Sequence, residues 1–132
     1  MMSKLNAIFL SHGGGPLPLM GDPNHAQLTA HLKELGSTLP EPSAILVVSA
    51  HWEEEVPTIT SGATPALIYD YHGFPPEAYT LTYPAPGHPT LAQKIFEALT
   101  RAGQRPRLDP KRGFDHGMFV PLSLMYPRAH IP

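Results

Sequence analysis

The stretch ILVVSAHWEEE, residues 45–55, decides the fold that we expect for this chain. Residues 44–50 form an almost wholly apolar run, and His51 stands where that run ends. A short run of this kind is typical of a strand that is covered on both faces in a parallel sheet. The sequence therefore predicts a buried parallel strand over residues 44–50, with a histidine at its carboxyl end.

The same arrangement occurs earlier in the chain. The stretch LSHGGGPLPL, residues 10–19, places His12 between the apolar run of residues 6–10 and the three glycines of residues 13–15. Consecutive glycines stop a strand and begin a loop. We therefore expect a first strand over residues 6–10 that ends at Ser11 or His12.

A helix is expected between these two strands. Asp22 is a good N-cap, Pro23 suits the first helical position, and Gly36 suits the C-terminal end. The apolar residues between them recur at helical spacing: Leu28, Leu32, Leu35 and Leu39. This pattern predicts a helix over residues 23–36, and a strand, helix and strand in this order form a right-handed crossover unit.

The rest of the chain predicts three more regular elements. Residues 56–62 favour a third strand, and residues 64–89 favour a long ordered loop because they combine many prolines with several aromatic residues. A helix opens at Pro89 and ends at Gly103. A last helix is expected over residues 119–125, with Pro121 in its first turn.

The expected fold is therefore α/β, with three layers and a mostly parallel central sheet flanked by helices. The chain stops at AHIP without a closing strand, so we expect a truncated version of this arrangement. A length of 132 residues corresponds to one domain.

Composition excludes several classes of function. The 9 basic and 11 acidic residues give a net charge of −2, and no basic block could follow a phosphate backbone, so nucleic acid is not an expected partner. No apolar stretch approaches the ~20 residues that span a bilayer, and residues 1–10 lack the features of a signal peptide. We expect a soluble cytoplasmic protein without membrane contact.

His12 and His51 are candidate metal ligands. Ligands of open parallel sheets bind at the carboxyl ends of the strands, where both residues are expected. The chain has no cysteine and 8 histidines, so a metal site would use imidazole, carboxylate and water. The alternative is that each histidine only makes a hydrogen bond in its loop. The glutamates at residues 53–55 are a further candidate ligand source, although a run of charges is usually a solvated surface.

His116 is a candidate general acid or base. In the stretch RGFDHGMF, residues 112–119, it lies between Asp115, which can orient the imidazole or cap the next helix, and Gly117, which allows a ligand to approach the backbone. The alternative is an ordinary capping turn whose histidine faces water.

Four motifs together resemble the class III extradiol ring-cleavage dioxygenases, and within them the 4,5-DOPA dioxygenase type, in the superfamily of the protocatechuate 4,5-dioxygenase catalytic subunit. The resemblance runs in order along most of the chain. The motifs are SHGGGPLPL (11–19), SAHWEE (49–54), HGFPPEAYTLTYPAPG (72–87) and GFDHGMFVPLSLMYP (113–127).

This resemblance implies one non-haem metal ion, Fe(II) or Zn(II), at the carboxyl edge of an α/β sheet. His12 falls on the first metal-ligand position of the family and His51 on the second, whereas His116 falls on a histidine that handles a substrate proton. The implied substrates are a small catecholic molecule and O₂. Iron with open positions can hold both, and an imidazole nearby can move a proton.

Family members are about twice as long as this chain and supply their remaining metal ligands from the second half. We therefore expect residues 1–132 to be the N-terminal part of a single catalytic domain, inactive in isolation and self-associating through an exposed sheet edge. Two alternatives remain at this point: a small metal-binding or partner-binding module without catalysis, and a purely structural α/β fragment.

Overall fold

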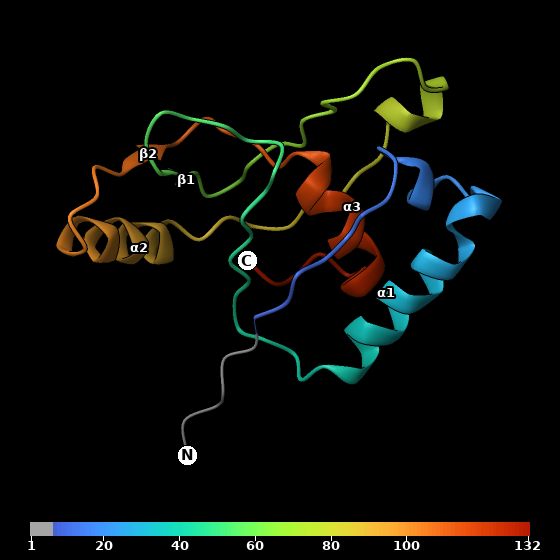
Figure 1. Ribbon diagram of the computed structural model, residues 1–132, viewed down its shortest axis with the longest axis horizontal. Coiled ribbons are helices and arrows are strands. Elements are labelled where there is room, and N and C mark those ends of the chain that lie inside the picture. The colour runs from blue at the N-terminus through green and yellow to red at the C-terminus, as the bar shows by residue number, and fades with distance from the viewer. Residues whose placement is uncertain (1–6) are drawn as a thin grey trace.

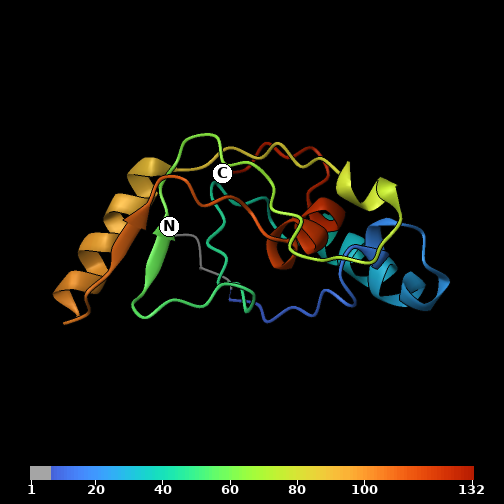
Figure 2. The ribbon, with the colours of Figure 1, turned by 90° about the horizontal axis from the view of Figure 1, so that it is seen from above.

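The computed structural model describes residues 7–132, and the chain forms an elongated body (Figure 1). Figure 2 shows α2 and the two strands at one end, and α1, α3 and the short 3₁₀ helices at the other, with extended segments between them. In chain order the elements are η1 (Leu17–Leu19), η2 (Pro23–His25), α1 (Ala26–Thr38), β1 (Thr58–Thr60), η3 (Pro76–Tyr79), α2 (Pro89–Arg101), β2 (Arg107–Asp109) and α3 (His116–Met125).

The sheet confirms the α/β class and its parallel pairing. β1 and β2 run parallel, with Ile59 opposite Leu108, and α2 is the crossover between them. An isolated parallel bridge between Leu67 and Phe114 brings the chain after β1 beside the chain after β2. The third predicted strand, residues 56–62, is therefore confirmed as β1, whereas β2 was not expected from the sequence.

The two strands expected at residues 6–10 and 44–50 are not found in the described part of the chain. Residues 7–10 and 44–50 are extended but form no strand ladder, and residue 6 lies outside the described residues. A ladder requires a neighbouring backbone. In residues 44–50 the N–H of Ile45 donates a long-range backbone hydrogen bond to the carbonyl of Pro132, 2.8 Å long, and one such bond does not make a ladder. The apolar pattern predicted the extended conformation, but pairing depends on a partner segment.

Helix α1 agrees with the prediction except at its ends. Its first turn is the separate 3₁₀ helix η2, and α1 continues past Gly36 to Thr38. Gly36 does not end the helix. A β-carbon there would lie 2.2 Å from the carbonyl oxygen of Met125, so this glycine allows α1 to pack closely against the end of α3.

Helix α3 begins at His116, three residues before the predicted start, because Asp115 caps it by accepting a hydrogen bond from the N–H of Met118. Pro121 consequently lies inside the helix and not in its first turn. The helix is apolar on all sides and nearly all of it is buried, so α3 forms the centre of the core.

The proline-rich loop of residues 64–89 is ordered, as predicted, by hydroxyls of its tyrosines. Tyr69 donates to the carbonyl of Leu81, and Tyr83 donates to the carbonyl of Tyr126 just after α3. None of the helices described in residues 7–132 has the length and apolar character that a membrane crossing requires.

Candidate metal centre

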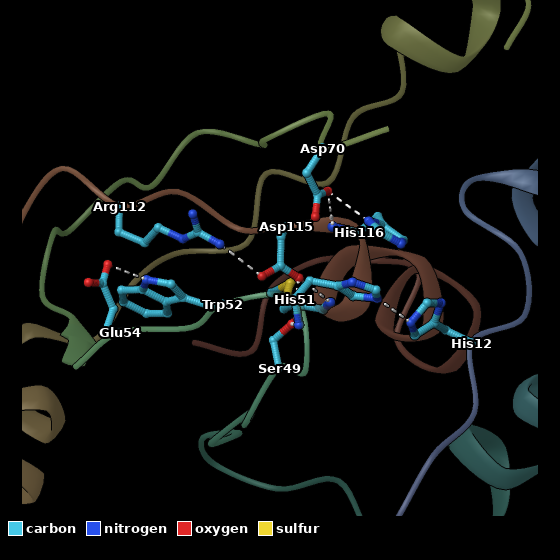
Figure 3. A network of polar contacts seen from close by, with 10 residues as sticks. His12, Ser49, His51, Trp52, Glu54, Asp70, Arg112, Asp115 and His116 are labelled. Atoms are coloured by element: carbon cyan, nitrogen blue, oxygen red, sulfur yellow. Dashed lines mark hydrogen bonds and ion pairs between the residues drawn. The ribbon is translucent and has the colours of Figure 1, made fainter. Parts of the chain in front are cut away.

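Three histidines from three distant segments meet beside the N-terminus of α3 (Figure 3). His12, His51 and His116 each offer a ring nitrogen within 4.8 Å of the other two. The Nε2 atoms of His12 and His51 are 2.8 Å apart, and the ring centroids of His51 and His116 are 4.1 Å apart. The structure thus brings together the three residues that the sequence pointed to, although His12 and His51 follow extended segments and not paired strands.

Asp70 orients His116. The Oδ1 atom of Asp70 accepts a 2.7 Å hydrogen bond from the Nδ1 atom of His116 and a 3.0 Å hydrogen bond from its backbone N–H. A carboxylate at Nδ1 places the proton on that atom, so Nε2 keeps its lone pair. His116 itself is buried, with 6% of its surface exposed, because it opens the buried helix α3.

Asp115 holds the segment of His51 against α3. Its Oδ1 atom accepts hydrogen bonds from the hydroxyl of Ser49, at 2.8 Å, and from the N–H of Met118. The Ser49 hydroxyl oxygen in turn accepts from the N–H of His51. Arg112 completes the group with a 3.1 Å ion pair to Asp115. Of the two roles that the sequence allowed for Asp115, capping is therefore the one observed, and orientation of His116 belongs to Asp70.

The surroundings of His12 favour its neutral imidazole. Burial, followed by repulsion from His116 and His51, lowers the pKa of His12 below its ordinary value. For Asp70, burial alone would raise the pKa, but the two hydrogen bonds from His116 outweigh it and lower the pKa. At neutral pH His12 is thus an uncharged ring with a free lone pair, and Asp70 is a carboxylate.

These residues fit a divalent metal. Two nitrogens that each lie ~2.1 Å from one ion are about 3.0–3.4 Å apart at octahedral or tetrahedral angles, so the two Nε2 atoms, 2.8 Å apart, need to separate only slightly to share an ion. The Nδ1 atom of His12 is buried without a hydrogen-bond partner among the described residues, so no other group there fixes the ring through that atom. Imidazole nitrogens suit zinc and iron.

The glutamates at residues 53–55 do not join this cluster, which within residues 7–132 consists of histidines alone. Glu54 instead accepts a hydrogen bond from the indole of Trp52 (Figure 3). Glu54 also forms an ion pair with Arg107. The ring of Trp52 also lies under the guanidinium of Arg112, at 4.7 Å. The alternative given above for these glutamates, a solvated surface, agrees with the exposure of all three.

Comparison with known proteins identifies the family. The model of the family described as the catalytic LigB subunit of aromatic ring-opening dioxygenase matches residues 6–132. The chain belongs to the LigB family. The match includes the segments of all three clustered histidines, and it confirms the resemblance to the extradiol dioxygenases.

LigB relatives among curated proteins are similar over nearly the whole chain. The dioxygenase tasH of Hapsidospora irregularis is 49% identical, covering 99% of this chain and 43% of the relative. The 4,5-DOPA dioxygenase extradiol of Portulaca grandiflora is 41% identical (99% and 48%), and that of Escherichia coli K12 is 44% identical (98% and 46%). The chain thus spans a little under half the length of these relatives.

A solved LigB relative shares the fold. The crystal structure of an uncharacterized protein from Escherichia coli K12 is 42% identical and superimposes with a TM-score of 0.54, covering 79% of this chain and 37% of that one.

Sequence reasoning missed two residues that shape the centre. Asp70 lies in the aromatic loop, 46 residues before His116, and no local pattern links the two. His25 was not among the candidate residues named from the sequence, yet its Nε2 atom accepts a hydrogen bond from the N–H of Gly14, two residues after His12. The sequence signal available for His25 was its position three residues after Asp22, to which its Nδ1 atom binds.

Proposed function

We propose that this chain carries the metal-binding and proton-transferring histidines of an extradiol ring-cleaving dioxygenase, which acts on a small catecholic substrate with O₂. The observation that carries this proposal is the convergence of His12, His51 and His116. The names of the relatives, a dioxygenase and two 4,5-DOPA dioxygenases, support the reaction class.

In this proposal His12 and His51 hold one non-haem metal ion, Fe(II) or Zn(II). Their Nε2 atoms lie 2.8 Å apart, and the lowered pKa of His12 keeps its lone pair available. If Fe(II) were bound there with open positions, it would supply the coordination sites that hold a catecholate and O₂ together.

His116 transfers the substrate proton. Its Nδ1 atom is occupied by Asp70, so its Nε2 atom is the group able to accept a proton from a catechol hydroxyl and to return it during ring opening. The carboxylate of Asp70 stabilises the imidazolium formed in between, because it lies 2.7 Å from the protonated Nδ1.

A metal titration separates these roles. We expect the chain to bind Co(II), a coloured substitute for Fe(II) and Zn(II), and expect His12→Ala and His51→Ala each to abolish binding. His116→Ala should retain it within a few fold, because the proposal assigns this ring to proton transfer and leaves the ion to His12 and His51. His31→Ala, an exposed histidine on α1, is the matched control. If the His12 and His51 variants bound Co(II) as tightly as the wild-type chain, the proposed centre would be excluded. Loss of Co(II) binding in the His116 variant would make that residue a ligand.

We also propose that residues 1–132 are the first part of a single catalytic domain and do not open a catechol ring without further ligands. This is supported by the greater length of the relatives and by the weak hold that two imidazoles have on a divalent ion. The test is to load Fe(II) without oxygen, add a catechol and then air, and follow colour and mass. A yellow ring-opened product from a monodisperse monomer would show that the ligand set is complete within the chain.

A further inference from the structure

Two aromatic rings contact the glycine loop, residues 13–15, that follows His12. Gly13 and Gly15 have positive φ angles of 73° and 51°, which glycine adopts without strain. A β-carbon on Gly13 would lie 2.5 Å from Cδ2 of His25, and one on Gly15 would lie 3.0 Å from the ring of Phe74. The side chains of His25 and Phe74 therefore contact the loop from its first and last glycine, although Gly13 and Gly14 themselves are exposed.

A hydrogen bond joins this loop to His25. The N–H of Gly14, two residues after His12, donates to the Nε2 atom of His25 over 3.0 Å. On the other side of the ring, Nδ1 lies 2.5 Å from the Oδ2 atom of Asp22. A carboxylate at Nδ1 keeps the proton there, so Nε2 is left as the acceptor that the Gly14 N–H needs. The His25 and Asp22 side chains are only 18% and 21% exposed, which shields the pair from water.

The hydrogen bonds join Gly14, in the loop, to His25 and Asp22, which belong to a part of the chain that packs against the core. Asp22 precedes η2 and His25 is its last residue. η2 leads directly into α1, and α1 packs against the core helix α3. His12 has no helix or strand of its own, and its Nδ1 atom has no partner among residues 7–132. The bond from Gly14 to His25 is therefore a hydrogen-bonded link, two residues from His12, between the glycine loop and an element that leads into the packed helix α1.

We propose that His25, oriented by Asp22, is a positioning residue of the metal centre: it holds the glycine loop so that the imidazole of His12 points at His51. The ligand role of His12 rests on the function proposed above. The hydrogen bond by which His25 holds the loop does not depend on that proposal, because it forms with or without a metal.

The first test measures the loop in the metal-free chain. We expect the Gly14 amide to be protected from hydrogen exchange, and the protection to fall by 10-fold or more in His25→Ala. His25→Gln should restore it, because a glutamine amide oxygen can accept at the position of Nε2. A Gly14 amide that exchanges at the same rate in the wild-type chain and in His25→Ala would overturn the proposal.

The second test measures the effect on the metal centre. We expect His25→Ala to weaken Co(II) binding by about 10- to 100-fold and to change its visible spectrum, with His25→Gln close to wild type. His31→Ala, on the exposed side of α1, is the control for loss of a histidine, and the thermal midpoint of each metal-free variant reports any general loss of stability.

The outcomes separate the two proposals. A protected Gly14 amide in a chain that binds no Co(II) contradicts the proposed function and leaves the hold on the loop intact. Normal Co(II) binding and an unchanged spectrum in His25→Ala overturn the positioning role while the proposed function stands. A glutamine variant no better than alanine in either test also counts against the role, because the acceptor atom would then not matter.

Discussion

His116 receives its orientation from a residue far away in the sequence. Asp70 accepts hydrogen bonds from its backbone N–H and from its Nδ1 atom, so the residue is held at its backbone and at its ring before any substrate arrives. The Tyr71 ring lies edge-on to it, with 5.6 Å between ring centroids. A proton-transferring group held in this way loses little freedom during the reaction, which is the property that acid–base catalysis requires.

In the active enzyme we expect His116→Ala to lower ring-cleavage turnover by about 10²- to 10⁴-fold, the usual effect of removing a positioned proton-transfer group. Metal content should stay nearly unchanged, because His12 and His51 remain. The measurement is steady-state turnover of a catechol beside metal analysis of the same sample.

Asp70→Asn should give a smaller loss of turnover, roughly 10- to 100-fold, since the His116 ring remains but its proton is no longer held by a charge. An Asp70 variant as active as wild type would contradict the role of this carboxylate.

At the scale of elements, the contact between α1 and α3 depends on one glycine. Gly36→Ala would place a β-carbon 2.2 Å from the Met125 carbonyl oxygen, which is backbone and cannot rotate away. We expect the helices to separate and the free energy of unfolding to fall by about 1–3 kcal/mol, as for overpacked cores. Chemical denaturation measures this. Ser37→Ala, at the next and exposed position of the same helix, is the control and should change stability by less than about 0.5 kcal/mol. A Gly36→Ala chain as stable as the control would show that the two helices are not packed this closely.

Tyr83 attaches the loop of residues 64–89 to the end of α3. Its titration makes the stability of the fold vary with pH in the alkaline range. Burial, followed by the nearby Tyr126, raises the pKa of Tyr83 from 10.0 to about 12, and its hydroxyl donates to the Tyr126 carbonyl over 2.9 Å. Because the folded pKa is above the unfolded one, this contribution is fully present below pH 10.0 and is lost as the pH rises through about 12.

We therefore expect Tyr83→Phe to cost about 1 kcal/mol near neutral pH, through the lost hydrogen bond. The difference between variant and wild type should shrink between pH 10.0 and about 12, because the wild-type chain loses its own contribution there. Urea unfolding of both chains at several pH values measures this, and groups that titrate in both chains cancel in the comparison. A difference that stays constant up to pH 12 would mean that Tyr83 is not the group responsible.

At the scale of the whole molecule, apolar extended segments lie on the surface. Val48 is 92% exposed, Leu46 is 64% exposed, and Phe9 is fully exposed at 100%. Residues 45–48 also line a cavity of about 610 Å³ between α2, β1, α3 and residues 131–132. Extended apolar backbone without a ladder partner is a common site of association.

We expect the isolated chain to self-associate through this surface at micromolar to millimolar concentrations. Val48→Lys should shift the chain toward monomer, because a charge at an exposed position opposes burial and removes no contact of the core. Gln27→Lys, an exposed position on α1, adds the same charge elsewhere and should leave association unchanged. Light scattering across a concentration series measures the mass. A wild-type chain that stays monomeric throughout would contradict the expectation.

The sequence alone determined the local features of this protein. Apolar spacing was enough for α1 but not for its ends. Spacing and end residues were enough for α2, and the stretch of residues 56–62 gave the position of β1. The motifs around His12, His51 and His116 were enough for the family, because each signal lies within a few consecutive residues. The aromatic content of residues 64–89 was likewise enough to predict an ordered loop.

Only the tertiary structure decided which groups meet across long sequence separations. Asp70 binds His116, His25 binds the glycine loop, and Gly36 packs against the end of α3. The sequence next to each of these residues does not indicate its partner. The runs at residues 7–10 and 44–50 did not become paired strands for the same reason. An apolar pattern sets which faces of an extended segment seek burial, but hydrogen-bonded pairing and side-chain contacts depend on what the rest of the chain places beside it.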